Sequence, residues 1–277
     1  MKNSVKMIAK LLVSTAALAG LSAQAATVEF SFQSGIQTAS NNNLAYGKTS
    51  TRINSNNTAN APSGTGAGFY VETFDGNNTL GVPISTPGQG CGLATLDSSL
   101  ISVGTGSYDV RKGTLTNVGA TPAGDKTCFA YGPGPTYPDG RNAKIKVDYS
   151  GLPPMTRVAY LGVYYGSIDT YNDIAFYDGA SLMLGGGGLL DDGILSGSEI
   201  LALLGGSSGD QVSDKSNVYV NIDFAESENF TAFEFRTTGI AFELDNVVTE
   251  IRDIPEPASV LLFSLGLLAL AGIRRKT

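Results

Sequence analysis

The sequence predicts an all-β protein, a jelly-roll-like β-sandwich into which one short helix is inserted. Three observations support this fold class. The 277 residues include 35 glycines and many Asn, Ser and Thr residues, a composition that favours short strands joined by turns. Segments in which apolar and polar residues alternate recur along the chain, as expected for strands with one buried face. A single stretch near residue 200 has the pattern of a helix.

In the first half of the chain, predicted strands are separated by polar segments. Thr27–Phe32 predicts the first strand. Residues 34–68 are dominated by Asn, Ser, Thr, Ala and Gly, and they predict a long, polar, flexible loop. Phe69–Asp75 returns to a strand pattern, and residues 107–115 and 126–132 contain two further short candidates.

The second half contains longer strand candidates, namely Ala143–Gly151, Thr156–Ser167, Asn172–Gly179, Ser216–Ala225, Phe230–Thr238 and Ile240–Ile251. We expect the second and third to form a hairpin across Asp169-Thr170, and the last three to be neighbours in one sheet. Alternation places Val218, Val220 and Ile222 on one buried face.

The helix is expected where Ser198-Glu199 precedes an apolar run that ends at Gly205-Gly206. These residues supply an N-terminal cap, a packing face and a C-terminal stop. We expect this helix to contribute packing and not function.

Residues 1–25 have the organisation of a secretory signal peptide. Lysines precede an apolar run, Leu11–Leu21, and Ala23 and Ala25 flank Gln24 as a small-x-small cleavage site. We therefore expect export by the Sec machinery and cleavage after Ala25. The alternative, an uncleaved anchor helix, is disfavoured because the apolar run is short for a bilayer span.

The C-terminal residues 253–277 combine three features. Pro255, Glu256 and Pro257 form a stiff, extended linker. Residues 258–273 are apolar and uncharged, and they predict a transmembrane segment about 24 Å long as a helix. Arg274, Arg275 and Lys276 then act as a stop-transfer signal that stays on the cytoplasmic side, which leaves the body outside. A plain membrane anchor is the alternative reading.

In this order, the three features resemble the PEP-CTERM sorting signal of Gram-negative bacteria. The resemblance implies recognition by exosortase, a membrane-embedded, cysteine transpeptidase-like enzyme, and cleavage near Pro255–Pro257. It also implies transient anchoring in the inner membrane before transfer to the outer surface or the extracellular matrix, commonly alongside exopolysaccharide and biofilm production. Residues Leu161–Gly179 and Phe233–Val247 resemble the bodies of such surface proteins, which implies a location and a fold but no reaction.

Two cysteines, Cys91 and Cys128, lie in the exported body, residues 26–252. An oxidising compartment predicts a disulfide between them, although a pair of unlinked thiols is the alternative.

The composition excludes several kinds of chemistry. The chain has no histidine, which removes Ser-His-Asp and Cys-His catalysis and histidine zinc sites. Pairs such as Glu72 with Asp75, or Glu243 with Asp245, could serve a glycosidase, but nothing in the sequence shows a sugar cleft around them. We therefore expect no enzymatic activity. The acidic body, in a chain of net charge −7, argues against binding to nucleic acid.

The sequence predicts no cofactor, and a structural calcium ion is the alternative that it leaves open. In jelly-roll modules a calcium often joins the first strand to the last, and by that analogy Glu72, Asp75, Asp245 and Asn246 are its expected ligands. Solvated acids at turns are the ordinary alternative.

The expected function is that of a non-catalytic cell-surface or extracellular-matrix protein, sorted by exosortase and associated with exopolysaccharide or biofilm. The alternative is a carbohydrate-binding module whose face is lined by Tyr160, Tyr164, Tyr165 and Tyr171. Aromatic packing is the ordinary role of such residues in strands, and the absence of tryptophan weakens the lectin reading. A secreted hydrolase that uses carboxylates alone is a third possibility.

Overall fold

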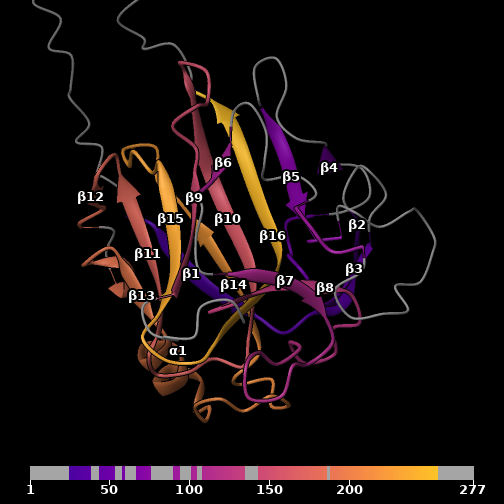
Figure 1. The fold of residues 1–277 in the computed structure, drawn as a ribbon. Helices are drawn as coiled ribbons and strands as arrows, with labels where there is room; N and C mark the ends of the chain where they lie inside the picture. The colour runs from indigo at the N-terminus through magenta and orange to yellow at the C-terminus, as the bar shows by residue number, and fades with distance from the viewer. Residues whose placement is uncertain are drawn as a thin grey trace, which may run out of the picture.

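Two main β-sheets pack face to face around one apolar core (Figure 1). The computed structural model describes residues 25–38, 44–53, 58–59, 67–75, 90–93, 101–104, 108–134, 143–185 and 188–254. The predicted signal peptide up to Gln24 and the C-terminal sorting segment from Pro255 onward lie outside the described residues.

The first sheet is antiparallel apart from a short parallel pair, β4 with β5. Its strands in spatial order are β1 (Thr27–Ser31), β14 (Val218–Asp223), β10 (Thr156–Gly166), β16 (Phe242–Asp253), β5 (Gly68–Glu72) and β4 (Thr58–Ala59). Two more strands extend it, because β8 (Cys128–Gly132) pairs with the start of β16 and β7 (Asp109–Lys112) pairs with β8.

The second sheet is antiparallel throughout its described strands. In spatial order these are β12 (Ser181–Leu182), β11 (Asn172–Asp178), β15 (Ala232–Thr237), β9 (Ala143–Asp148) and β6 (Ser102–Val103), and β13 (Ile194–Ser196) also pairs with β11. A separate hairpin joins β2 (Ser34–Thr38) to β3 (Leu44–Lys48), and a 3-10 turn, η1, covers Gly188–Leu190.

Two predicted neighbour relations are wrong, because successive long strands cross between the sheets. β10 lies in the first sheet and β11 in the second, so they do not form the expected hairpin. Likewise β14 and β16 flank β10 in the first sheet, whereas β15 lies in the second. Alternation tells which face of a strand is buried, but both sheets bury their faces in the same core, so it does not tell which sheet the strand joins.

The predicted inward faces are confirmed. Val218, Val220 and Ile222 are fully buried in the core between the sheets. Phe235 on β15 contacts three other rings, with centroid distances of 5.2 Å to Tyr165, 6.1 Å to Phe233 and 5.9 Å to Phe242. Because these rings come from β10, β15 and β16, Phe235 joins the two sheets at the centre of the core.

The prediction that residues 34–68 form a flexible loop is wrong for part of that segment, because β2, β3 and β4 lie within it. Lys48, the end of β3, is only 5% exposed, and the Ser50 hydroxyl lies 2.7 Å from the hydroxyl of Tyr160 on β10. Gly47 has a φ of +103°, and a Cβ at this position would lie 2.4 Å from the Tyr164 ring. The polar composition therefore suits close packing against the tyrosine-bearing outer face of the first sheet.

The predicted helix is confirmed as α1 (Gly197–Leu204), which lies at the lower end of the sandwich in Figure 1. Its N-cap is Ser196 and not Ser198. Ser196 and Glu199 form a capping box, in which each side chain accepts from the backbone N–H of the other residue. Gly205 ends the helix in the left-handed conformation, as expected.

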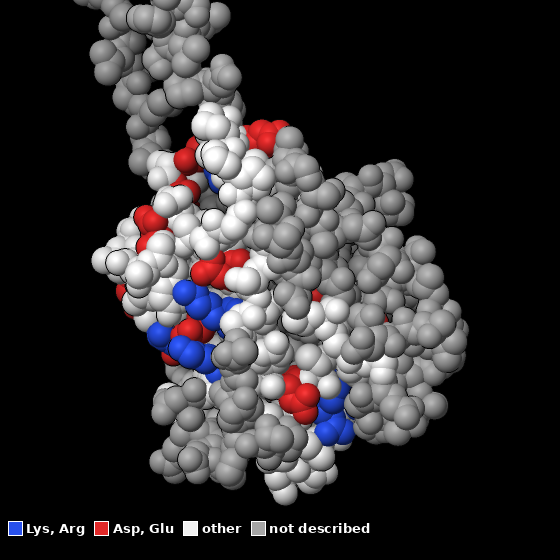
Figure 2. Space-filling model, turned by 45° about the horizontal axis from the view of Figure 1, so that its top comes forward, with Lys and Arg blue, Asp and Glu red and all other residues white. Residues whose placement is uncertain are grey.

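Charges of both signs cover the outer face of the second sheet. Lys144 pairs with Glu234 at 3.2 Å, Arg236 pairs with Asp173 at 3.6 Å, and the Lys146 ammonium lies 4.8 Å from the centre of the Tyr177 ring. On the face shown in Figure 2, acidic and basic side chains also lie next to one another. The pair of Arg236 with Asp173 is partly exposed, and such pairs contribute little to stability, whereas Glu234 is buried beneath its neighbours.

Candidate functional site

A β-bulge in β16 forms the base of a buried polar cluster. The register between β10 and β16 shifts between the pairs Gly162/Val248 and Tyr164/Asp245, so two residues of β16 lie opposite one of β10. Asn246, inside the bulge, has a φ of +48°. Asp245 and Asn246 are both fully buried. Bulges re-aim side chains and are over-represented beside functional sites.

Asp125, in the connection between β7 and β8, brings a third polar side chain to this cluster. Its Oδ1 accepts hydrogen bonds from the backbone N–H of Thr127, at 2.8 Å, and from the Thr127 hydroxyl, at 2.7 Å. Its Oδ2 is buried without a hydrogen-bond partner among the described residues, and so are both carboxyl oxygens of Asp245 and Oδ1 of Asn246.

The backbone of Tyr46 in β3 links these side chains. Its N–H donates to the hydroxyl of Thr127, which holds Asp125, and its carbonyl accepts from Nδ2 of Asn246 at 3.1 Å. Burial, with the charge of Asp125 next in size, raises the pKa of Asp245 well above its usual range. Burial also raises the pKa of Asp125 to about 6, and the nearby side chain of Asp245 lowers that pKa by a smaller amount. The two carboxyl groups therefore lie close together.

Asp75 lies beside this pair. The backbone N–H of Cys128 donates to its Oδ1 at 3.2 Å, and the predicted disulfide between Cys91 and Cys128 is present, with a Cα–Cα distance of 5.6 Å. Burial, with smaller contributions from the charges of Asp125 and Glu72, raises the pKa of Asp75 to about 7, and the hydrogen bond from Cys128 opposes this rise. Glu72 itself accepts a hydrogen bond from the backbone N–H of Phe74 at 2.6 Å, so it holds the turn that follows β5.

The structure thus brings together the four residues that the sequence suggested as calcium ligands and adds Asp125, which the sequence reading missed. A signal for Asp125 was available, because it lies three residues before a cysteine predicted to form a disulfide. In the part of the chain that the structure describes, no three His, Cys, Asp or Glu side chains are arranged so that they could hold a metal ion by themselves.

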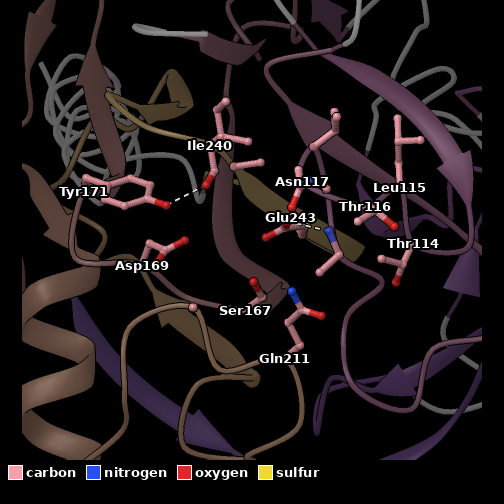
Figure 3. Close-up of a pocket in the computed structure, with 15 residues that line it drawn as sticks. Thr114, Leu115, Thr116, Asn117, Ser167, Asp169, Tyr171, Gln211, Ile240 and Glu243 are labelled. Carbon is pink, nitrogen blue, oxygen red and sulfur yellow. Dashed lines mark hydrogen bonds between the residues drawn. The ribbon is translucent and has the colours of Figure 1, made fainter.

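A separate pocket of about 560 Å³ opens near the start of β16 (Figure 3). In Figure 3, Asp169 and Tyr171 lie on one side, residues 114–117 lie on the other, and Glu243 lies between them. The backbone N–H of Ala120 donates to Oε1 of Glu243 at 2.8 Å, and the Tyr171 hydroxyl donates to the carbonyl of Ile240 at 2.6 Å.

Glu243 and Asp169 are the acidic side chains of this pocket. Burial raises the pKa of Glu243 well above its usual range, and the charge of Asp169 adds to the effect. Burial also raises the pKa of Asp169, whose Oδ1 accepts from the Ser208 hydroxyl at 2.7 Å. Asp245 does not line the pocket, so the structure separates the pair Glu243 and Asp245 that the sequence suggested for a glycosidase.

A tyrosine-lined binding face is not formed. Tyr160, Tyr164 and Tyr165 are fully buried, the first two beneath the β2–β3 segment and the third in the main core. The hydroxyl of Tyr164 donates to the carbonyl of Ala123. Tyr171 does line the pocket, so one of the four tyrosines is placed to meet a ligand.

Comparison with known proteins identifies one feature of the chain. Residues 253–276 match the family model of the PEP-CTERM protein-sorting motif. The chain therefore carries the sorting motif that its C-terminal sequence resembles. No curated protein and no solved structure matches the chain. Among the described residues, no helix has the length and apolar character needed to cross a membrane.

Proposed function

We propose that this protein is a non-catalytic component of the bacterial outer surface or extracellular matrix, delivered there by exosortase and associated with exopolysaccharide or biofilm. The match to the sorting motif at residues 253–276 is the observation that carries this proposal. That motif implies export and processing by exosortase, which is therefore the expected partner enzyme.

The fold supports this division of the chain into a body and a sorting tail. β16, the last strand of the body, ends at Asp253, where the motif begins. The backbone N–H of Ile254 still donates to the carbonyl of Met155 at 2.6 Å. The described body is therefore completed immediately before the Pro-Glu-Pro sequence at which the proposal places processing.

The other end of the body is compatible with signal-peptide removal after Ala25. The backbone nitrogen of Ala26 lies 2.9 Å from Oε1 of Glu228. Cleavage would turn this nitrogen into an ammonium group, and the existing hydrogen bond would become a charge-assisted one.

Within the proposal, the body is a jelly roll. The order β5-β16-β10-β14 in one sheet and β9-β15-β11-β13 in the other supports this assignment. This is the order that results when a long antiparallel hairpin is rolled into two facing sheets.

The proposal predicts that the exported protein from the native host lacks residues 258–277. Intact-mass measurement should place its C-terminus near Pro255–Pro257, and the variant Glu256→Ala should retain the full tail and stay in the inner-membrane fraction. The matched control is Glu226→Ala, which removes an exposed acid of the body and should leave processing unchanged. A wild-type mass that includes Thr277 would identify a permanent membrane anchor instead.

A second candidate function is carbohydrate binding by the pocket around Glu243. The specific observation in its favour is the polar lining, in which Tyr171, Asn117 and Gln211 surround a buried carboxyl group. Sugar-binding sites combine hydrogen-bonding side chains with an aromatic ring in this way.

If the pocket binds a glycan, an array probed with the exported protein should show a ligand. Asn117→Ala and Gln211→Ala should each weaken its binding by about 2- to 12-fold, the effect of losing one hydrogen bond. Both side chains are exposed, and because Asn117 has a φ of +62°, Asn117→Gly, which accepts that conformation, is measured beside Asn117→Ala. Gln33→Ala, at an exposed position away from the pocket, is the control. Equal binding by all variants would exclude the pocket, and cleavage of the array glycans would favour the hydrolase alternative.

A further inference from the structure

We propose that Asp125, Asp245 and Asn246, with Asp75 beside them, bind a calcium ion between the bulge of β16 and the connection from β7 to β8. The ion would join the last strand of the first sheet to the loop that precedes Cys128. The ligand set differs from the one that the sequence suggested, because Glu72 holds its own turn and Asp125 is added.

The first argument is the state of the buried oxygen atoms. Both carboxyl oxygens of Asp245, Oδ2 of Asp125 and Oδ1 of Asn246 are buried and accept no hydrogen bond from any described group. Buried polar atoms in folded proteins are almost always satisfied, and the cost of leaving a carboxylate unsatisfied is large. A cation is a partner that satisfies several such oxygens at once.

The second argument is the local balance of charge. Asp125, Asp75 and Glu72 are the acids whose charges act on Asp245, and Lys112 is a cation whose charge acts on Asp75 at the edge of the cluster. Lys48, the last residue of β3, directs its ammonium to Asp214 at 2.6 Å and not to this cluster. The close carboxyl groups therefore either share a proton or bind a cation.

The chemistry of the oxygens favours calcium among the cations. Ca²⁺ takes six to eight oxygen ligands from carboxylates, amides and backbone carbonyls, and it tolerates irregular geometry. Mg²⁺ requires near-octahedral geometry and usually keeps several waters. A set of two or three carboxyl groups with one amide oxygen, all buried, suits the larger ion. Because no three such acids of the described residues form a metal site by themselves, backbone carbonyls and waters would have to complete the coordination.

The test is calcium-dependent thermal stability of the full exported protein, measured by calorimetry after treatment with a chelator. Calcium at about 100 times its Kd should raise the Tm by about 5–10 °C relative to the chelated protein, whereas magnesium at the same concentration should raise it much less. Elemental analysis after dialysis should find one calcium per chain. An unchanged Tm in millimolar calcium, with no metal retained, would overturn the proposal and leave the shared proton as the explanation.

Variants show whether the ion binds at this cluster. Asp245→Asn keeps the shape of the side chain but removes its charge, so the calcium-dependent shift should be lost. Asp125 lies in a loop, and Asp125→Asn should also abolish the calcium-dependent shift. This second variant tests the proposal if Asp245→Asn does not fold. The control is Glu234→Gln, a buried acid of the second sheet that pairs with Lys144, and it should keep the full shift. A full shift in both aspartate variants would place the ion elsewhere and contradict the assignment.

Discussion

Replacing Cys91 and Cys128 together by alanine is expected to lower the free energy of unfolding by about 4 kcal/mol. The disulfide joins residues 37 positions apart, so its loss releases a long loop in the unfolded chain and increases the entropy of that state. Cys128 is fully buried, and alanine leaves no polar atom there. The measurement is urea unfolding of the exported double variant beside the wild type.

The reduced wild-type protein is the control for this prediction. It should unfold at nearly the same urea concentration as the double variant, because both lack the crosslink. The disulfide also fixes the segment that holds Asp75, through the backbone N–H of Cys128. Equal stability of the oxidised and reduced wild type would contradict the prediction.

Phe235→Ala is expected to lower the free energy of unfolding by about 3–5 kcal/mol, the usual cost of removing a large ring from a packed core. The side chain is fully buried, and it contacts the rings of Tyr165, Phe233 and Phe242. The cavity would therefore open where the two sheets meet. Chemical denaturation with circular dichroism at a backbone wavelength measures the loss.

Phe32→Ala is the matched control, because its ring is 45% exposed. Its effect should stay within about 0.5 kcal/mol, as for most surface substitutions. A loss below about 1 kcal/mol for Phe235→Ala would mean that the core relaxes into the cavity, which would contradict its placement at the centre of the sandwich.

The sequence predicted the local features of the fold well, because they depend on near neighbours in the chain. The alternation in Val218, Val220 and Ile222 fixes an inward face whatever the neighbouring strand is, and Gly205 stops the helix by its own conformation. The partner of each strand depends on the path of the whole chain. The expected hairpin between β10 and β11 failed for this reason.

The β2–β3 segment shows a second limit of sequence reading. Its composition is that of a loop, yet Ser50 bonds Tyr160, and Asn246 donates to the carbonyl of Lys48. A polar segment can pack as part of a fold when the surface that it covers is itself polar. No pattern within residues 34–68 reveals that surface, because its residues come from β10 and β16.

The candidate cation site was predicted in part. Asp245 and Asn246 are adjacent in sequence, and Asp75 follows β5, which pairs with the same strand, so analogy was enough to group them. Asp125 joins them through Thr127 and Tyr46, contacts that exist only in the folded chain. The pocket that contains Glu243 and Asp169 likewise depends on crossings between the sheets.

The position of β16 affects how the body would respond to mechanical force. β16 runs through the middle of the first sheet, with β10 on one side and β5 and β8 on the other, and the sorting tail continues from its end. If the processed chain stays attached through this end, drag from flowing water pulls along β16. The strand can leave only by sliding past both neighbours, so many backbone hydrogen bonds must break together. An edge strand such as β1 would peel away one bond at a time, whereas attachment through β16 holds the body by an interior strand that is paired on both sides.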